Sequence, residues 1–311
     1  MSEIRVVAVT PNPAVDVTYR VAEQRLGETV RVQEVLRRPG GKGVNVARVL
    51  AALDRPVLAV QPLGGPAGQW LEQALQADGL EVLTVASPTE TRTTVAVDDG
   101  RTHPTLYAEP GPAQSEAVWA ALVEAVGTSA RPRGWVVVSG SLPPGTDPSV
   151  AGDLVTAARA AGARVLVDTS GPALLAAAAA GADLLSPNAA EAVEATGAGD
   201  LDGAVDRLLA EGAGAVVVSR GPGGLLARTS RGERLTQPAV PDVEGNPTGA
   251  GDAATAGLVD ALGRGHSLAD ALREAAVLGA AAVLSPAAGD VDPAVLDTLR
   301  ARLPATTPPE G

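Results

Sequence analysis

The sequence of 311 residues contains no cysteine and only two histidines, His103 and His266. Without cysteine it has no disulfides, thiolate nucleophiles or zinc–thiolate sites, and two distant histidines do not make a histidine-rich metal site. Positive charge is also scarce, because 24 Lys and Arg residues face 36 Asp and Glu residues, for a formal net charge of −12. General binding to nucleic acid or to acidic membranes, which needs broad positive surface, is therefore not expected.

Long hydrophobic runs are missing as well. The longest apolar tract, Pro172 to Ala182, is much shorter than the roughly 20 residues of a membrane-spanning helix. Met1 to Thr10 contains Glu3 and Arg5 and lacks the apolar stretch of a signal peptide. With 45% hydrophobic and 19% charged residues, the chain can bury a core. We expect a soluble, cytoplasmic protein that binds neither nucleic acid nor membrane.

Rare polar residues gather in turn-like segments of this Ala-, Gly- and Val-rich chain. The single lysine, Lys42, shares a glycine-rich segment with Asn45, and the other three asparagines lie in proline-flanked turns, at Asn12, Asn188 and Asn246. One such residue is explained by chance. Five in segments of the same kind favour a chemical role.

Short apolar runs alternate with helical segments, most regularly in the second half of the chain. Strands are expected over 4–10, 15–21, 29–35, 57–61, 82–85, 93–97, 105–107, 135–139, 164–168, 184–186 and 215–219, with antiparallel strands within 223–237. Helices are expected over 46–53, 67–77, 115–126, 148–161, 172–180, 189–196, 201–211, 250–262, 268–284 and 293–303. This order indicates an α/β fold, a mostly parallel sheet with helices on both faces. We predict one domain over 1–303, lid strands from about 15–35 and 93–107, and a flexible proline-rich tail over 304–311.

The strongest chemical signal is the segment 246–252 (NPTGAGD), which leads into a predicted helix. The helix opens on three small residues, Gly249, Ala250 and Gly251. Their exposed N–H groups, at the positive end of the helix dipole, can hold a phosphate or a developing anion. Asp252, in the first turn, can accept a proton from an alcohol beside that site. The alternative is an ordinary helix start with an acid in its first turn.

Other glycine-rich strings are weaker signals. Residues 249–254 fit the dinucleotide pattern G-x-G-x-x-A, but no clear strand precedes them, so an oxidoreductase is a distant alternative. The letters TGAGD recur at 196–200 between two helices, where Asp200 is expected to cap the second helix. Gly40 to Gly43 is not a phosphate-binding loop of the GKS/T type, because Val44 follows.

Candidate sugar-binding residues lie in the first third of the chain. Asp16 can chelate two hydroxyls, Gly41 allows close approach of the backbone, and Asn45 can bond hydroxyls. Lys42 and Arg92 can meet phosphates, Arg92 through two parallel bonds. For Asp16 the alternative is a solvated hairpin acid, and for Arg92 a surface arginine.

Candidate nucleotide-binding residues follow later strands. Asn188 and Glu191 (N-x-x-E) can position Mg²⁺ through water, or they form a helix cap with its first-turn acid. The turn of Ser219, Gly221 and Gly224 can admit an adenine or ribose, or it is a hairpin turn. Because ligands bind beyond the carboxyl ends of parallel strands, these groups are expected to converge on one rim of the sheet.

Five strings, in order along nearly the whole chain, together resemble the ribokinase-like sugar kinases of the phosphofructokinase B (PfkB) type. They are TPNPAVD (10–16), PGGKGVN (39–45), SGSLPPG (139–145), PNAAE (187–191) and GAGD (249–252). The first resembles the opening of 1-phosphofructokinases and tagatose-6-phosphate kinases. Five such strings in the right order are highly specific.

The resemblance implies a three-layer α/β/α kinase that transfers the γ-phosphoryl group of Mg–ATP to a sugar hydroxyl. Asp252 would be the base and Gly249, Ala250 and Gly251 the anion hole. Sugar contacts would come from Asp16, Gly41 and Asn45, and contacts to its phosphate from Arg92 and Ser141, assisted by Lys42. The nucleotide would lie at Asn188, Ser219, Gly221 and Gly224, with Mg²⁺ near Glu191. The lid would also pair subunits, which implies a homodimer.

Three segments depart from the family pattern, and the departures weaken the assignment of the sugar. Ser186 replaces a lysine of many relatives, Pro247-Thr248 replaces Thr-Val, and Thr29 replaces a lid lysine for which Arg31 can substitute. The leading substrate is fructose 1-phosphate, phosphorylated at its 6-hydroxyl. The alternatives are tagatose 6-phosphate, fructose 6-phosphate or an unphosphorylated sugar. A different class also stays open, a sugar-phosphate-binding protein without turnover.

Overall fold

A nine-stranded sheet forms the centre of the computed structural model, which describes residues 6–25, 27–101, 104–285 and 290–307. Its order is β13-β12-β11-β10-β9-β8-β1-β4-β5. The strand β12 pairs antiparallel with β11 and with β13 at one edge, and the other neighbouring strands pair in parallel. The strands are β1 (Val6–Val9), β4 (Val57–Leu63), β5 (Glu81–Ala86), β8 (Trp135–Ser139), β9 (Arg164–Asp168), β10 (Leu184–Leu185), β11 (Ala215–Ser219), β12 (Leu225–Thr229) and β13 (Arg234–Gln237).

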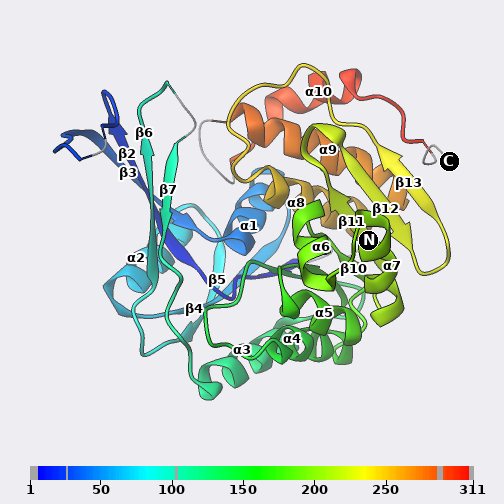
Figure 1. Ribbon diagram of the computed structural model, residues 1–311. Coiled ribbons are helices and arrows are strands. Elements are labelled where there is room, and N and C mark those ends of the chain that lie inside the picture. Colours follow the sequence, from blue (N-terminus) through cyan, green and yellow to red (C-terminus); the bar gives the residue numbers. More distant parts are fainter. Residues whose placement is uncertain (1–5, 26, 102–103, 286–289, 308–311) are drawn as a thin grey trace.

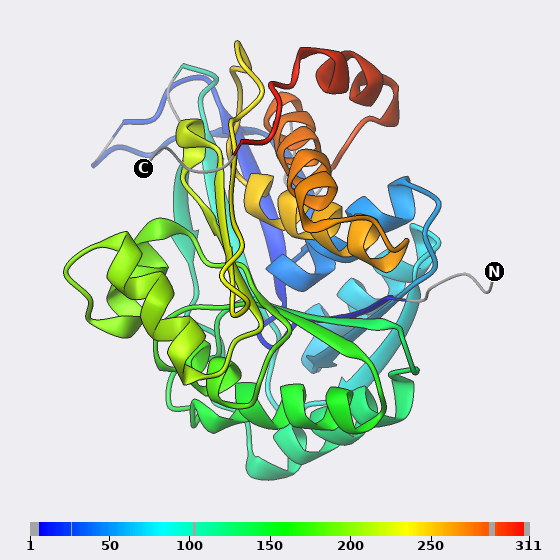
Figure 2. The ribbon, with the colours of Figure 1, turned by 90° about the vertical axis from the view of Figure 1, so that its right-hand side faces the viewer.

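Helices cover both faces of this sheet, as Figure 1 shows. One layer consists of α1 (Lys42–Ala52), α2 (Gly65–Ala77), α8 (Ala250–Gly263), α9 (Leu268–Leu284) and α10 (Leu296–Arg302). The other consists of α3 (Glu116–Ser129), α4 (Ser149–Ala160), α5 (Pro172–Ala179), α6 (Ala189–Thr196) and α7 (Leu201–Glu211). Figure 2 shows the two layers on opposite sides of the sheet. The expected three-layer α/β/α fold is confirmed.

Strand β1 shows why the core has two halves. Val6 and Ala8 pack against the layer of α1 and α8, whereas Val7 and Val9 pack against the layer of α3 and α4. Successive side chains of a strand point to opposite faces, so a continuous apolar run is buried on both sides.

A separate four-stranded sheet stands beside the central sheet (Figure 1). Its order is β3 (Val32–Gly40), β2 (Ala14–Val21), β6 (Arg92–Asp98) and β7 (Thr105–Ala108). β2 pairs antiparallel with β3 and parallel with β6, and β6 pairs antiparallel with β7. We call these four strands the small sheet; they come from the segments expected to form a lid.

The start of α1 corrects two expectations. The helix begins at Lys42 rather than at residue 46, and the strand before it covers 32–40 rather than 29–35. Gly41, with φ of 108°, turns the chain directly from strand to helix. Gly43 lets α1 lie against β1, since a Cβ there would come 2.5 Å from the carbonyl oxygen of Val9. The glycines therefore allow a tight turn from β3 into α1 rather than forming a loop.

The C-terminal segment also differs from expectation. The helix predicted over 293–303 is a short 3₁₀ turn (Pro293–Val295) followed by α10. Within the predicted flexible tail, Thr307 exchanges two backbone hydrogen bonds with Thr236 of β13. Residues 308–311, like the first two residues of the strand predicted over 4–10, lie outside the described part of the chain.

Candidate active site

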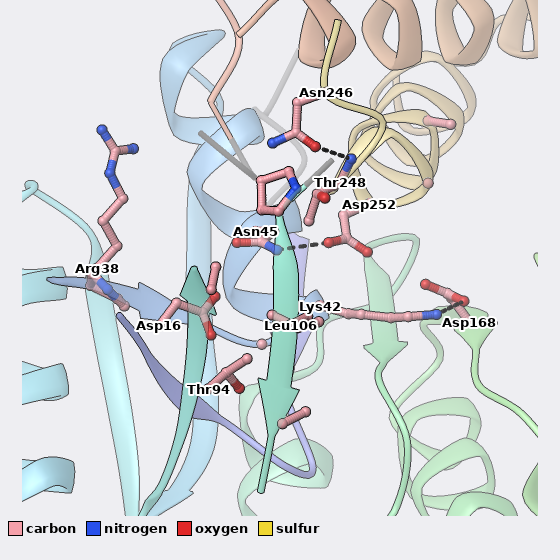
Figure 3. A pocket seen from close by; sticks show the side chains of 18 of the residues that line it. Asp16, Arg38, Lys42, Asn45, Thr94, Leu106, Asp168, Asn246, Thr248 and Asp252 are labelled. Atoms are coloured by element: carbon pink, nitrogen blue, oxygen red, sulfur yellow. Dashed lines mark hydrogen bonds and ion pairs between the residues drawn. The ribbon is translucent and has the colours of Figure 1, made fainter. Parts of the chain in front are cut away.

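A cavity of about 550 Å³ lies between the small sheet and the carboxyl ends of the central strands. Its lining comes from β2, β3, β6 and β7 on one side and from β9, β11, α1 and α8 on the other. Figure 3 shows Asp16 and Thr94 on the small-sheet side and Asp252 and Asp168 opposite. The cavity lies at the rim where the sequence predicts ligand binding.

Asp252 lies in the first turn of α8 and is 6% exposed. Its Oδ2 accepts a 2.7 Å hydrogen bond from Nδ2 of Asn45 (Figure 3). Burial raises the pKa of Asp252 to about 7, the Asp168 carboxylate adds to this rise, and Asn45 and Lys42 oppose it. The carboxyl group therefore changes protonation near neutral pH, as a general base requires.

The N-terminus of α8 forms a candidate anion site beside Asp252. Gly249 caps the helix with φ of 82°, and Asn246 holds the preceding turn by accepting a 3.0 Å bond from the N–H of Thr248. Among the described residues, none accepts a hydrogen bond from the N–H groups of Gly251 or Asp252. A Cβ at Gly251 would meet no atom within 4 Å, so this face of the helix start is open. Such a helix start can bind a phosphate.

Lys42 reaches from the start of α1 to two carboxylates. Its Nζ lies 3.1 Å from Oδ1 of Asp168 and 3.6 Å from Oε1 of Glu191. Burial opposes the charge on Lys42, but the carboxylates of Asp168, Glu191 and Asp252 outweigh it and raise the pKa of Lys42. The Lys42 ammonium therefore keeps its charge at neutral pH.

The carboxylates of Asp168 and Glu191 suit a divalent cation. Oδ2 of Asp168 accepts from the Ser139 hydroxyl at 2.8 Å, and Oε2 of Glu191 accepts from the Asn188 N–H at 2.9 Å. One oxygen of each carboxylate is thus held by an uncharged donor, and the other faces the Lys42 ammonium, at a place suited to a cation. Mg²⁺ prefers such oxygens and takes its remaining ligands from water and phosphates. Among the residues described, no group of three or more potential metal ligands is found.

Asp16 faces the cavity from β2. Burial raises its pKa to about 6, although Arg92, Thr94 and Arg48 act in the opposite direction. A Cβ at Gly40 would lie 2.1 Å from Oδ2 of Asp16, so glycine at that position makes room for the carboxylate. Asp16 is therefore a half-buried acid that lines the cavity rather than a solvated hairpin residue.

Arg92 lies at the start of β6 and also lines the cavity. Nε and Nη2 donate to the carbonyl oxygen of Asn12 at 3.2 and 3.1 Å, and Nη1 donates to that of Glu109 at 2.8 Å. Burial lowers the pKa of Arg92, while Asp16 and Glu109 act to raise it. An arginine has five N–H groups, so two of them stay available for a ligand.

Most of the candidate residues line this cavity. They are Asp16, Gly41, Lys42, Asn45, Arg92, Asn188, Glu191, Ser219, Gly249, Gly251 and Asp252. Four others, Ser141, Ala250, Gly221 and Gly224, are not in its lining. Gly224 lies just before β12 and packs tightly against the end of β13, since a Cβ there would come 2.1 Å from the carbonyl oxygen of Gln237.

Two helix caps expected from the sequence are present. Asp200 accepts a 2.8 Å bond from the N–H of Gly203, so the second TGAGD string is a helix start. Asn188 and Glu191 form a capping box on α6 and line the cavity as well. The cap and the candidate site are therefore compatible.

Sequence reasoning missed some lining residues, above all Asp168. This acid ends the buried run VLVD of β9, and an acid at the carboxyl end of a parallel strand was the available signal. Arg38 and Thr94 also line the cavity. The sequence did not point to them, because the pairing register of their strands could not be derived from it.

Comparison with known proteins identifies the family of the chain. A family model described as pfkB family carbohydrate kinase matches residues 3–294. The chain belongs to this family. It is a carbohydrate kinase by membership, with ATP as the expected phosphoryl donor, and the resemblance found in the sequence is confirmed.

Similar curated and solved proteins span almost the whole chain. A 1-phosphofructokinase of Rhodobacter capsulatus is 36% identical over 298 residues, covering 91% of this chain and 92% of that protein. A 1-phosphofructokinase of Haloferax volcanii is 37% identical over 277 residues, covering 86% and 87%. Phosphofructokinase-2 from Escherichia coli, in complex with potassium, superposes with a TM-score of 0.89 at 29% identity, covering 97% and 99%. Within the described part of the chain, no helix has the length and hydropathy needed to span a membrane.

Proposed function

We propose that this pfkB family kinase is a 1-phosphofructokinase. It transfers the γ-phosphoryl group of ATP to the 6-hydroxyl of fructose 1-phosphate and releases fructose 1,6-bisphosphate and ADP. The observation that carries the proposal is Asp252, a buried acid with a pKa of about 7 beside the open N-terminus of α8. The two curated relatives named 1-phosphofructokinase support the choice of sugar.

Asp252 is the general base of the proposed reaction. One of its oxygens is held by Asn45, and the carboxylate takes the proton of the attacking hydroxyl. The N–H groups of Gly251 and Asp252 stabilise the transferring phosphoryl group through the helix dipole and direct hydrogen bonds, whereas the N–H of Ala250, expected to join them, donates to the carbonyl oxygen of Pro247. Proton acceptor and anion site belong to the same helix turn, so the two parts of the reaction are aligned by the backbone.

Asp168 and Glu191 hold Mg²⁺ in this proposal, and Asn188 and Ser219 border the nucleotide. When bound, the metal neutralises charge on the nucleotide phosphates. The protein's part is to keep one oxygen of each carboxylate directed at that place, through Ser139 and the capping box of α6.

Asp16, Gly41 and Asn45 hold the sugar, and Arg92 binds its phosphate. The guanidinium of Arg92 is fixed by backbone carbonyls, so it offers its two free N–H groups without further ordering. Fructose 6-phosphate is a second candidate acceptor, because a structure of the similar Escherichia coli phosphofructokinase-2 is a complex with fructose 6-phosphate.

The small sheet is proposed as a lid that also pairs two copies of the chain. Val32 and Val35 of β3 and Tyr107 of β7 are exposed by 41, 50 and 55%. These large apolar side chains lie on the two edge strands of the small sheet, where a second copy would cover them. Light scattering should give the mass of a dimer, and Val35→Asp should give that of a monomer. A wild-type monomer at micromolar concentration would refute this.

ADP release with Mg–ATP against a panel of acceptors tests the function. The panel contains fructose 1-phosphate, fructose 6-phosphate, tagatose 6-phosphate, fructose, ribose and adenosine. Turnover confined to fructose 1-phosphate, with the bisphosphate identified by ³¹P NMR, is the expected result. Turnover on free sugars alone would contradict the proposal that Arg92 binds a phosphate of the sugar. Folded protein that binds fructose 1-phosphate without ADP release would support a binding protein instead.

A further inference from the structure

Lys42 is the single lysine of the chain, and its ammonium lies between carboxylates from two other elements. Asp168 ends β9 and Glu191 lies in the first turn of α6, whereas Lys42 begins α1. Figure 3 shows the long side chain of Lys42 extended across the cavity towards Asp168. Three elements far apart in the sequence therefore meet at one cationic group.

The Lys42 ammonium contacts the carboxylate oxygens for which no other described residue supplies a hydrogen bond. Ser139 and the Asn188 N–H bind Oδ2 of Asp168 and Oε2 of Glu191, while Lys42 faces Oδ1 and Oε1. Lys42 thus takes the two oxygens that the proposed function assigns to a divalent cation. A divalent cation bound at these oxygens would be repelled by the nearby ammonium, because like charges repel strongly in a partly buried site.

The other cavity-lining cations cannot replace Lys42 at this place. Among the described lining residues these are Arg20, Arg38 and Arg92, and each belongs to a strand of the small sheet. Arg20 pairs with Glu34, and Arg92 donates to backbone carbonyls. Without a bound cation, the carboxylates of Asp168 and Glu191 depend on Lys42 for balance of charge.

We propose that Lys42 is an internal counter-cation, which holds these two oxygens in the nucleotide-free protein and yields them to the divalent cation that arrives with the nucleotide. The inference rests on the proposed use of a metal–nucleotide complex. The displaced ammonium needs a new anionic partner, and the nucleotide phosphates supply one at the same moment. Metal alone supplies none, so the exchange couples binding of the metal to binding of the nucleotide.

Binding of Mn²⁺ alone to the nucleotide-free protein tests the exchange. Calorimetry, or the loss of the free-Mn²⁺ resonance signal, compares wild type, Lys42→Met and the double variant Lys42→Met/Asp168→Asn. We expect Lys42→Met to bind Mn²⁺ at least about tenfold more tightly than wild type, and the double variant to lose this gain. Arg20→Met removes a cavity cation elsewhere and should leave the Mn²⁺ affinity unchanged. Equal affinities of wild type and Lys42→Met, or a gain that survives Asp168→Asn, would overturn the proposal.

A second measurement uses wild-type protein and does not depend on the folding of a variant. With ¹⁵N-lysine, the chain gives one side-chain ammonium signal. Mg–ADP at saturation should shift this signal strongly, whereas Mg²⁺ alone at the same concentration should not. An unchanged signal under saturating Mg–ADP would contradict the exchange. Neither measurement involves a sugar, so an inactive panel would refute the proposed substrate and leave this result standing.

Discussion

Nδ2 of Asn45 donates a 2.7 Å hydrogen bond to Oδ2 of Asp252, joining the first turns of α1 and α8 across 207 positions of sequence. The bond fixes one oxygen of the carboxylate. It also stabilises the charged form of Asp252 and so opposes the rise in pKa caused by burial. The hydrogen bond therefore affects both the orientation of the Asp252 carboxylate and the pKa of the proposed base.

The pH dependence of kcat/KM should follow Asp252. Its pKa is raised from 3.8 to about 7, and a base acts only when deprotonated, so kcat/KM should fall as pH drops below about 7. Asn45→Ala removes a group that lowers this pKa and should move the acid limb to higher pH. Rates measured from pH 5 to 9 check both statements. An acid limb near pH 4, or one unmoved by Asn45→Ala, would contradict this reading of the bond.

Gly251→Ala should separate activity from stability. The added methyl group would project into the open anion site, so we expect kcat/KM for ATP to fall at least about tenfold. Alanine favours a helix over glycine by about 0.5–1 kcal/mol, so the melting temperature should not fall. Gly199→Ala is a matched control, because Gly199 holds the same place in the other TGAGD string and its Cβ is equally unobstructed. Equal activities of the two variants would show that the N-terminus of α8 is not the anion site.

How far the sequence predicts this structure depends on which interactions are local. The helices over 189–196, 201–211 and 268–284 have the predicted bounds, because their caps and apolar spacing lie within each segment. The predicted start of α1 was wrong, because the close contact of Gly43 with Val9 depends on tertiary packing, which local sequence patterns do not indicate. Asp168 was missed for the same reason: its partners Lys42 and Ser139 are 126 and 29 positions away.

Arg92→Ala should weaken binding of the phosphosugar selectively. Loss of two charge-assisted hydrogen bonds should raise the KM for fructose 1-phosphate at least about tenfold, with the KM for ATP nearly unchanged. Unphosphorylated fructose, tested at high concentration, should show no such penalty. Arg37→Ala changes an exposed arginine of the small sheet outside the cavity lining and serves as the control. If the KM for fructose 1-phosphate stays the same in Arg92→Ala, another group binds the sugar's phosphate.

The turnover of Asp252→Asn, set beside that of Asp200→Asn, tests the central claim most directly. Both aspartates end the string TGAGD in the same chain, but only Asp252 lines the cavity, and asparagine still caps a helix at position 200. With saturating Mg–ATP and fructose 1-phosphate, kcat of Asp252→Asn should fall by about 10²–10⁴, the usual effect of losing a general base. Asp200→Asn should keep the wild-type rate. Full turnover by Asp252→Asn would show that the base lies elsewhere.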